Sequence, residues 1–290
     1  MKKLAVALIL ALVLCGCGAQ TVEGPTETVW VLAQSVDEHY LQGIGFSNMT
    51  LYTYDENGNV VEELEYDGEG ELTGRTDYVY DDRGNQVDWK YCEYTGIFPV
   101  LRNRSKTTYD AQNRAVEYAY YDGWKKQSTL TYTYDEDGRT RSVEHSDGTR
   151  MEYLWDDNGR ETSCEITQPD GTVSVEQTAY VYDEKGNILR QSFYTDGELN
   201  LNLEYTYDDQ GRQIRCVRTD SGGTSVWEYR YDDEVHLFTT VYPDGRTRFE
   251  YSDENGNVIR VEHYDEDGSL TGQTTNTYRV MDVPADPDSD

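Results

Sequence analysis

The sequence predicts an all-β protein: an antiparallel meander of β-hairpin repeats whose sheet is curled or spiral. One signal is an eight-residue template that reads Tyr, any residue, Tyr or Trp, Asp, any two residues, Gly, and then Asn or Arg. The other is an Asp-Gly pair between successive copies, which indicates a hairpin turn when alternating residues flank it. Each repeat therefore contributes two strands and two turns, which gives about eighteen to twenty short strands.

The template recurs from residue 50 to the end of the chain. Its second aromatic residue returns at steps of 20 to 29 residues. The Asp-Gly pairs lie at 122–123, 147–148, 170–171, 196–197, 244–245 and 267–268. The copy at Phe249 differs in having one extra residue. Full copies begin at Tyr52, Tyr78, Tyr132, Tyr153, Tyr180 and Tyr205, and weaker ones at Thr107, Tyr229 and Phe249.

The composition limits the partners that the protein can have. The 290 residues include 56 Asp and Glu against 25 Lys and Arg, a formal net charge of -31. Because phosphate contacts need clustered cations, we expect no nucleic-acid partner. Leu, Ile, Val and Phe make up only about 19% of the chain, which borders on the composition of disordered proteins. The 26 tyrosines supply the missing apolar area if their rings pack.

The first residues have the pattern of an export signal. Two lysines precede an apolar run from Leu4 to Leu14, which is too short to cross a membrane as a helix. The following segment, Leu14-Cys15-Gly16-Cys17, resembles the lipobox of bacterial lipoproteins. The resemblance implies cleavage after Gly16 and lipid on Cys17. It places the protein on the outward side of the cell membrane, or in the periplasm if the envelope has two membranes. The alternative is an ordinary signal peptide.

These features divide the chain into four parts. Residues 1–16 are the lipoprotein signal peptide, 17–28 a polar linker, 29–280 the hairpin-repeat domain, and 281–290 an acidic disordered tail. We expect strands at 29–34 and 50–54 in the part before the first full turn. Cys92, Cys164 and Cys216 are interpreted as packing residues, because an odd number cannot pair within the chain.

The turn chemistry predicts a register for each hairpin. Asp opens a type I turn and Gly accepts the left-handed conformation that closes it. Asp55 should then face Asn59, and Tyr54 should face Val60. The same register sets Thr53 opposite Val61, Val79 opposite Val87, and Val181 opposite Leu189.

This register places the two template tyrosines on one face and an aliphatic row on the other. The row includes Val61, Val87 and Ile214. A sheet with apolar groups on both faces cannot lie flat in water. We therefore expect the aliphatic row to face inward and the tyrosine ladder to be partly exposed.

The template at this spacing, with an intervening Asp-Gly turn, resembles the YD repeats of the RHS family over residues 50–280. The resemblance implies a β-shell built from hairpins. In large members the shell encloses a C-terminal toxin, and related surface proteins use such repeats for cell-surface contact. No toxin-sized segment follows the repeats here, and residues 281–287 do not match the family's core ending. Choline- and glucan-binding repeats are a second resemblance, but they depend on regularly placed Trp, of which this chain has five.

The sequence contains no familiar catalytic or metal-binding pattern. Its four histidines lack metal-ligand spacing. Paired carboxylates are abundant but occur in turns, where Asp is expected for backbone reasons. We expect no enzyme activity, no cofactor and no metal site. The alternatives are a polysaccharide-acting enzyme that uses turn carboxylates, and Ca²⁺ bound by clustered turn oxygens.

The aromatic residues are the candidate binding site, because amphipathic rings stack on sugar faces. The alternative is that they pack against one another along the sheet. We expect a cell-surface binding or structural module with a glycan or other surface partner. The remaining alternative is a remnant of an RHS toxin-delivery protein. The candidate ligand-binding residues are Trp124, Trp227, Tyr132, Tyr134, Tyr180, Tyr182, Tyr205 and Tyr207.

Overall fold

The computed structural model describes residues 26–41, 44–96 and 98–284 of the chain. The signal peptide at 1–16 and the lipidation site Cys17 lie outside the described residues. Among the described residues, no helix is long and apolar enough to span a membrane.

The described chain is all β, as predicted, and forms one antiparallel sheet of twenty strands. The first ten are β1 (Thr26–Leu41), β2 (Ile44–Tyr54), β3 (Val60–Tyr66), β4 (Leu72–Tyr80), β5 (Gln86–Tyr94), β6 (Pro99–Tyr109), β7 (Ala115–Asp122), β8 (Lys125–Tyr134), β9 (Thr140–His145) and β10 (Arg150–Trp155). The others are β11 (Glu161–Thr167), β12 (Val173–Tyr182), β13 (Ile188–Thr195), β14 (Glu198–Tyr207), β15 (Gln213–Asp220), β16 (Gly223–Asp232), β17 (Leu237–Val241), β18 (Thr247–Ser252), β19 (Val258–Tyr264) and β20 (Leu270–Pro284).

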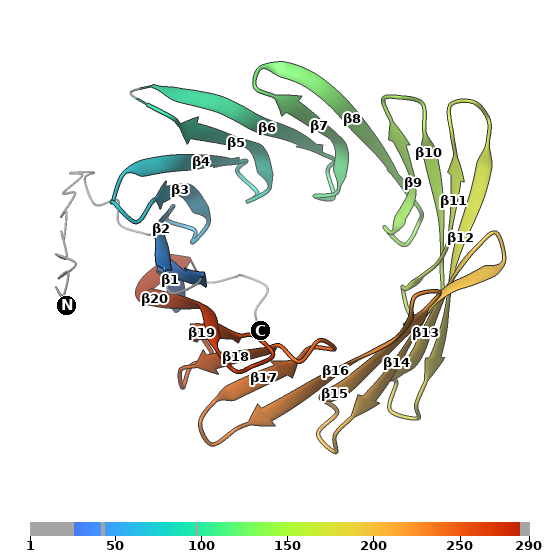
Figure 1. Cartoon of the computed structure of the whole chain (residues 1–290). Helices are drawn as coiled ribbons and strands as arrows, with labels where there is room; N and C mark the ends of the chain where they lie inside the picture. Colours follow the sequence, from blue (N-terminus) through green and yellow to red (C-terminus); the bar gives the residue numbers. More distant parts are fainter. Residues whose placement is uncertain (1–25, 42–43, 97, 285–290) are drawn as a thin grey trace.

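The sheet closes on itself, so the expectation of an open curled or spiral sheet is wrong. Each strand pairs with the next in sequence, and β1 also pairs with β20. On β1, Gln34 lies opposite Leu51 of β2, while Trp30 lies opposite Val280 of β20. Closure joins the two edges that an open sheet would leave unpaired. Figure 1 shows the resulting ring, with β1 and β20 side by side at the seam.

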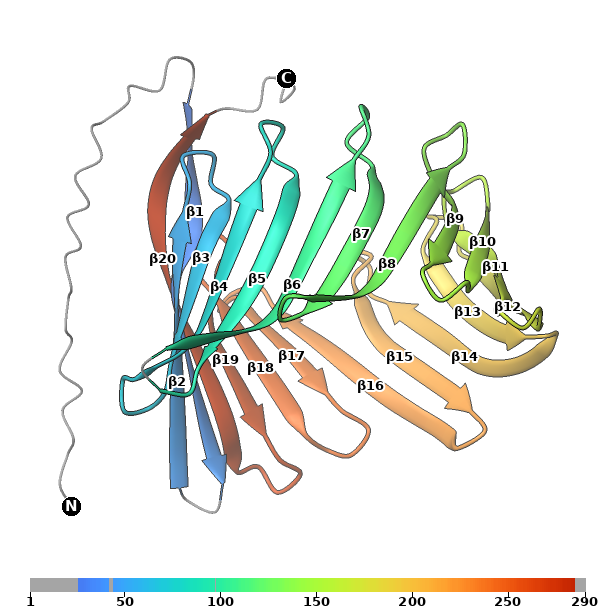
Figure 2. The same ribbon diagram turned by 90° about the horizontal axis from the view of Figure 1, so that it is seen from above.

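The seam strands are longer than the sequence indicated. β1 begins at Thr26, inside the stretch expected to be linker, and β20 continues to Pro284, inside the stretch expected to be a disordered tail. Backbone pairing between the two strands continues to these ends, where Thr26 lies opposite Pro284. In Figure 2 the two strands stand close together at one side of the ring.

The turns have the predicted chemistry. The Asp55 N–H donates to the Asn59 carbonyl (2.9 Å), and the Gly58 N–H donates to the Asp55 carbonyl (3.2 Å). Gly58 has φ of 83°, a left-handed conformation that a side chain would strain. All six Asp-Gly pairs likewise lie at connections between consecutive strands.

A bulge just beyond each template turn changes the register from the predicted one. Tyr54 lies opposite Val60, as expected, but Thr53 lies opposite Glu62. Val61 is the extra residue, so the pairing of Thr53 with Val61 is wrong. One inserted residue exchanges the faces of everything that follows it on that strand.

The same shift overturns the two other expected pairings. Val79 lies opposite Asp88 instead of Val87, and Val181 lies opposite Arg190 instead of Leu189.

The predicted assignment of faces is therefore also wrong. Val61, Val87 and Ile214 occupy the bulges. The other residues of the predicted aliphatic row, which follow at every second position along the same strands, share a face with the tyrosines. Residues opposite each other across a pair of strands lie on the same face. Such pairs are Tyr78 with Trp89, Tyr132 with Val143, Tyr153 with Cys164, and Tyr205 with Cys216.

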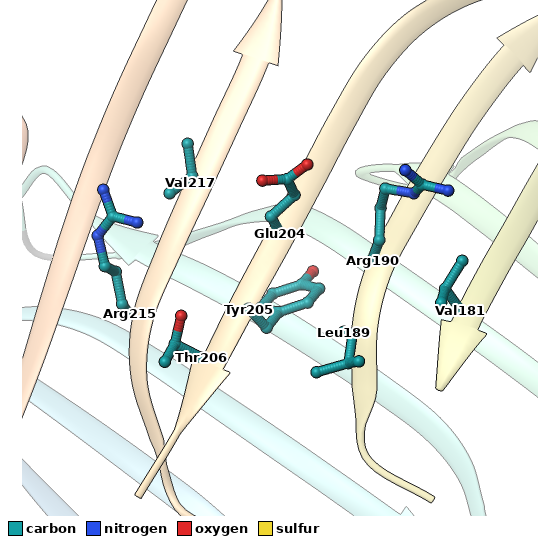
Figure 3. A pocket seen from close by; sticks show the side chains of 8 residues that line it. All are labelled: Val181, Leu189, Arg190, Glu204, Tyr205, Thr206, Arg215 and Val217. Carbon is teal, nitrogen blue, oxygen red and sulfur yellow. The ribbon is translucent and has the colours of Figure 1, made fainter. Parts of the chain in front are cut away.

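The tyrosine face lines the inside of the ring. Figure 3 looks at β13 to β15 with the opposite wall behind them, and Arg190, Glu204 and Val217 lie on the near side of these strands. Tyr205 follows Glu204 directly along β14 and therefore points to the other side, toward the interior. Both faces carry charged residues: Glu63 lies opposite Tyr52 on the inner face, whereas Arg190 lies opposite Glu204 on the outer face.

The copy at Phe249 is an exception to this arrangement. Its extra residue places Ser252 opposite Val258, the position that the second aromatic holds in the other copies. Tyr251 is thereby moved to the opposite face, where it pairs with Leu237 of β17.

The described residues do not fill the interior of the ring as a protein core is filled. None of their large side chains is fully buried. Twenty strands spaced about 4.8 Å apart and tilted by about 40°, as barrel strands are, place the walls of a round ring roughly 40 Å apart. Two facing layers of side chains do not span that distance, and barrels of similar strand number contain a channel or a plug.

Candidate functional site

In most repeats the second aromatic ties its hairpin to a backbone carbonyl of the preceding one, whereas the Tyr182 and Tyr251 hydroxyls donate to the carboxylates of Asp156 and Glu262. The Tyr80 hydroxyl donates to the Val60 carbonyl (2.9 Å), which lies beyond the last β3–β4 pair. A carbonyl at that place needs a partner, and the tyrosine supplies it. Equivalent bonds join Tyr54 to Leu32, Tyr109 to Gln86, Tyr134 to Ala115, Trp155 to Thr140, Tyr207 to Ile188, Tyr231 to Gln213 and Tyr278 to Val258.

The Asn or Arg at the last position of the template binds the carboxylate of the turn Asp. Asp183 Oδ1 accepts the backbone N–H groups of Lys185 (2.9 Å) and Asn187 (2.8 Å), and Oδ2 accepts the Asn187 side-chain amide (2.8 Å). The Asn187 side chain is the main cause of the lowered pKa of Asp183. A general acid needs a raised pKa, so these turn carboxylates are suited to holding the backbone and poorly suited to catalysis.

In three of the four template copies that end in Arg, the Arg side chain also stacks on an aromatic ring of the next repeat. The Arg212 guanidinium carbon lies 4.4 Å from the centroid of Tyr231, and Nε donates to Asp208 (2.8 Å). Sequence reasoning missed these cation–π contacts. The alternation of Asn with Arg at this position was the only available signal. The same arrangement places Arg114 on Tyr134 at 4.5 Å and Arg160 on Tyr182 at 4.7 Å.

Three of the candidate residues, with Gln191 and Cys216, form a band across the inside of β12 to β16, which we call the inner band. Tyr205 lies opposite Cys216, and Cys216 lies opposite Trp227. The Tyr205 hydroxyl donates to Gln191 (3.4 Å), and Gln191 lies opposite Tyr180. Burial raises the pKa of Tyr205 to about 12, so the ring stays uncharged.

The band continues toward the turns through Tyr182 and Tyr207. The rings of Tyr180 and Tyr182 stack with centroids 6.0 Å apart. The Tyr207 hydroxyl is fixed by Ile188, as described above. The inner band is therefore a row of half-buried rings, and hydrogen bonds hold the hydroxyl groups of its tyrosines.

The other three candidates lie elsewhere. Tyr132 and Tyr134 also face inward, on β8, where Tyr132 lies opposite Val143. Trp124 lies in the turn between β7 and β8, is 80% exposed, and approaches Arg104 of the outer face. The structure thus separates Trp124 from the tyrosines with which the sequence grouped it.

The outer face of β12 to β15 carries a shallow hollow of about 320 Å³ over the bulges (Figure 3). Val181, Arg190, Glu204 and Arg215 contribute to its lining. Its mixed charges and exposure to solvent do not select any one ligand.

The described residues contain no group of three or more His, Cys, Asp or Glu side chains placed to hold a metal ion. The turn carboxylates that suggested calcium each bind the backbone of their own turn.

The comparisons with known proteins give a fold likeness only. A family model described as an uncharacterised protein matches residues 150–249, about a third of the chain. No curated protein matches.

Among solved structures, the crystal structure of TcdB2-TccC3-TEV has 11% identity, a TM-score of 0.39, and 81% coverage of this chain. A Photorhabdus luminescens Tc holotoxin pore has 11% identity, a TM-score of 0.33, and 85% coverage. This chain spans only 16% and 18% of those two chains. A porin-like protein from Bacteroides uniformis has 10% identity and a TM-score of 0.37, with 86% of this chain and 98% of that chain covered. Because every TM-score is under 0.5, we draw no functional conclusion from them.

Proposed function

We propose that this protein is a non-catalytic binding module of the bacterial cell envelope that receives a glycan chain on the inner band. In this proposal lipid on Cys17 anchors the chain to the membrane, and the repeats belong to the YD type. The observation that carries the proposal is the row of aromatic rings that closure of the sheet places on its inner face. Tyr180, Tyr205 and Trp227 lie there on β12, β14 and β16.

The inner band has the chemistry of a sugar-binding surface. Tyr180, Tyr205 and Trp227 present apolar ring area, while Gln191 supplies polar groups between them. Rings that are already fixed lose little freedom when a ligand stacks on them. An extended polysaccharide needs such a continuous surface.

The charged outer face is unlike a wall that contacts lipid. Arg75 bonds Asp77 and Glu62, and Arg104 bonds Asp88, all on outward positions. Charges on a lipid-facing strand cost about 2–4 kcal/mol each near the membrane midplane. We therefore propose that the ring stands in water beside the membrane that anchors it.

The test is binding of neutral glycans to the full chain, measured by calorimetry with soluble cell-wall oligosaccharides and dextran. We expect Trp227→Ala to weaken binding at least about tenfold, which corresponds to about 1.4 kcal/mol. Trp227→Phe should restore part of the affinity because it keeps a ring.

Leu154→Ala is the matched control. Leu154 is an outward residue of β10 and is 66% exposed, so its loss should leave binding unchanged. Circular dichroism would establish that each variant is folded. The proposal fails if no neutral glycan binds, or if Leu154→Ala and folded Trp227→Ala weaken binding equally.

A further inference from the structure

A row of cationic side chains crosses the outer face of β5 to β8. Lys90 lies opposite Arg104, Arg104 opposite Tyr121, and Tyr121 opposite Lys126. Cβ atoms of such partners are about 5 Å apart. The row alternates along its strands with inward residues such as Trp89, so it points away from the interior. We call Lys90, Arg104, Tyr121 and Lys126 the basic row.

The basic row breaks a rule of sheet stability. Like charges directly opposite each other destabilise a sheet, yet Lys90 faces Arg104. Each cation of the row has a carboxylate beside it: Lys90 Nζ lies 3.4 Å from Asp77, Arg104 bonds Asp88, and Lys126 Nζ lies 4.0 Å from Glu117. Ion pairs at a surface are weak, so carboxylates of a ligand can compete for these cations.

An exposed ring stands at the end of the row. Trp124 is 80% exposed, and the Arg104 guanidinium carbon lies 6.0 Å from its centroid. The turn that carries Trp124 is fixed by the Gly123 N–H, which donates to the Arg102 carbonyl (2.7 Å). Its position beside cations offers a stacking surface for a ring that carries negative groups.

A hollow of about 420 Å³ adjoins the row on the same face. Val79 and Val87 line it together with Lys106, which lies two residues from Arg104. Arg83 contributes a second cation, and Asp81 and Asp88 contribute two carboxylates. The outer wall therefore combines a cavity, a cationic row and an exposed ring within four neighbouring strands and the edge of β4.

The local charge differs from that of the chain as a whole. Residues 86–134, which span β5 to β8, contain seven Lys and Arg against five Asp and Glu, while the chain carries -31. An anionic membrane would also meet the acidic surfaces around the strip and be repelled. A narrow linear polymer touches the strip alone, and charges beyond about 8 Å are largely screened at physiological salt.

We infer that the outer face of β5 to β8 is a second binding surface, for an acidic polysaccharide. Carboxylates of the polymer pair with Lys90, Arg104 and Lys126, and one sugar ring stacks on Trp124. This surface is separate from the inner band, on the other side of the sheet, and does not depend on the proposed function of that band.

The experiment measures binding of polygalacturonate to the full chain by calorimetry in low and high salt. We expect binding that weakens as sodium chloride rises, because the contacts are ionic and exposed. Lys126→Glu and Trp124→Ala should each weaken binding at least about tenfold. Lys185→Glu is the charge-matched control. Lys185 is an exposed turn lysine between β12 and β13, and its reversal should change binding less than about twofold.

Two further probes distinguish this partner from others. Polyglutamate carries the carboxylates without sugar rings, and phosphatidylglycerol vesicles present an anionic membrane. The inference is overturned if polyglutamate binds as tightly as polygalacturonate, if only the vesicles bind, or if no polyanion binds. Trp227→Ala should leave polygalacturonate binding intact, so failure of this inference and failure of the inner-band proposal can be told apart.

Discussion

At the scale of single residues, the template tyrosines have two different tasks. The ring of Tyr80 lies on the inner face, while its hydroxyl completes the hydrogen bonding of the neighbouring hairpin at Val60. A tyrosine at this place is therefore required by the backbone, whatever binds the ring. The preference for Tyr over Phe in the template follows from the hydroxyl.

Removing only that hydroxyl tests this role. Tyr80→Phe leaves the Val60 carbonyl without its partner, and we expect a loss of about 1 kcal/mol in the free energy of unfolding. Urea denaturation would show a lower midpoint with an unchanged slope. Tyr118→Phe is the control, because within the described residues the Tyr118 hydroxyl makes no hydrogen bond. A tyrosine-to-phenylalanine effect of equal size at both positions would contradict the assignment.

At the scale of the hairpin, the turn and the bulge differ in how well the sequence predicts them. Asp55 and Gly58 have side-chain or backbone properties that one turn type requires, so both turn hydrogen bonds were predictable. The bulge at Val61 was not, because no residue type is required there. Its position decided which face each later residue occupies. The sequence therefore predicted correctly that the template tyrosines share one face. It predicted wrongly that this face is the outer one.

The turn carboxylates predict a specific dependence on acid. Backbone bonding to Thr149, with help from His145, lowers the pKa of Asp147 to about 2. A carboxyl with a lowered pKa contributes stability above its unfolded value of 3.8 and loses it as the pH falls through the folded value. Asp147→Ala should therefore lower Tm at pH 6, and the gap from wild type should close near pH 2.

Glu136→Ala provides the comparison, because Glu136 is an exposed turn residue. Its Tm should match that of wild type at both pH values. A gap for Asp147→Ala that persists unchanged at pH 2 would show that the charge of this carboxylate contributes nothing.

At the scale of the whole molecule, closure is the feature that the sequence did not predict. The strand β1 carries no copy of the template, and its partner β20 lies at the other end of the chain. An excess of acid would protect the exposed edges of an open sheet from pairing with other chains. With β1 and β20 paired, that explanation of the charge is not needed.

The seam predicts a second dependence on pH. His263 on β19 lies opposite Gly272 on β20, which lies opposite His39 on β1. Burial, followed by Arg248, His39 and Arg246, lowers the pKa of His263, while Asp37 acts in the opposite direction. The folded protein therefore favours the neutral form of the His263 imidazole. The free energy of unfolding falls as the pH drops below 6.5, the pKa of histidine in the unfolded chain.

We expect the urea midpoint of wild type to be lower at pH 5 than at pH 8. His263→Gln should reduce this difference, because glutamine carries no proton to gain. His236→Gln is the control, since His236 lies in the turn between β16 and β17, away from the seam. If the urea midpoint of His263→Gln differs between pH 5 and pH 8 as much as that of wild type, His263 is not the cause of the pH dependence.

The seam also sets the order in which the ring can form. Nineteen of its strand pairings join neighbours in sequence, whereas Thr28 and Asp282, which bond across the seam, are 254 residues apart. Local hairpins form quickly and distant pairings slowly, because bringing the chain ends together costs entropy before any contact repays it. The last event in folding is then the meeting of β1 and β20. Until it occurs, two free edges are open to other copies of the chain, and the time spent in that state sets how readily the protein aggregates during synthesis.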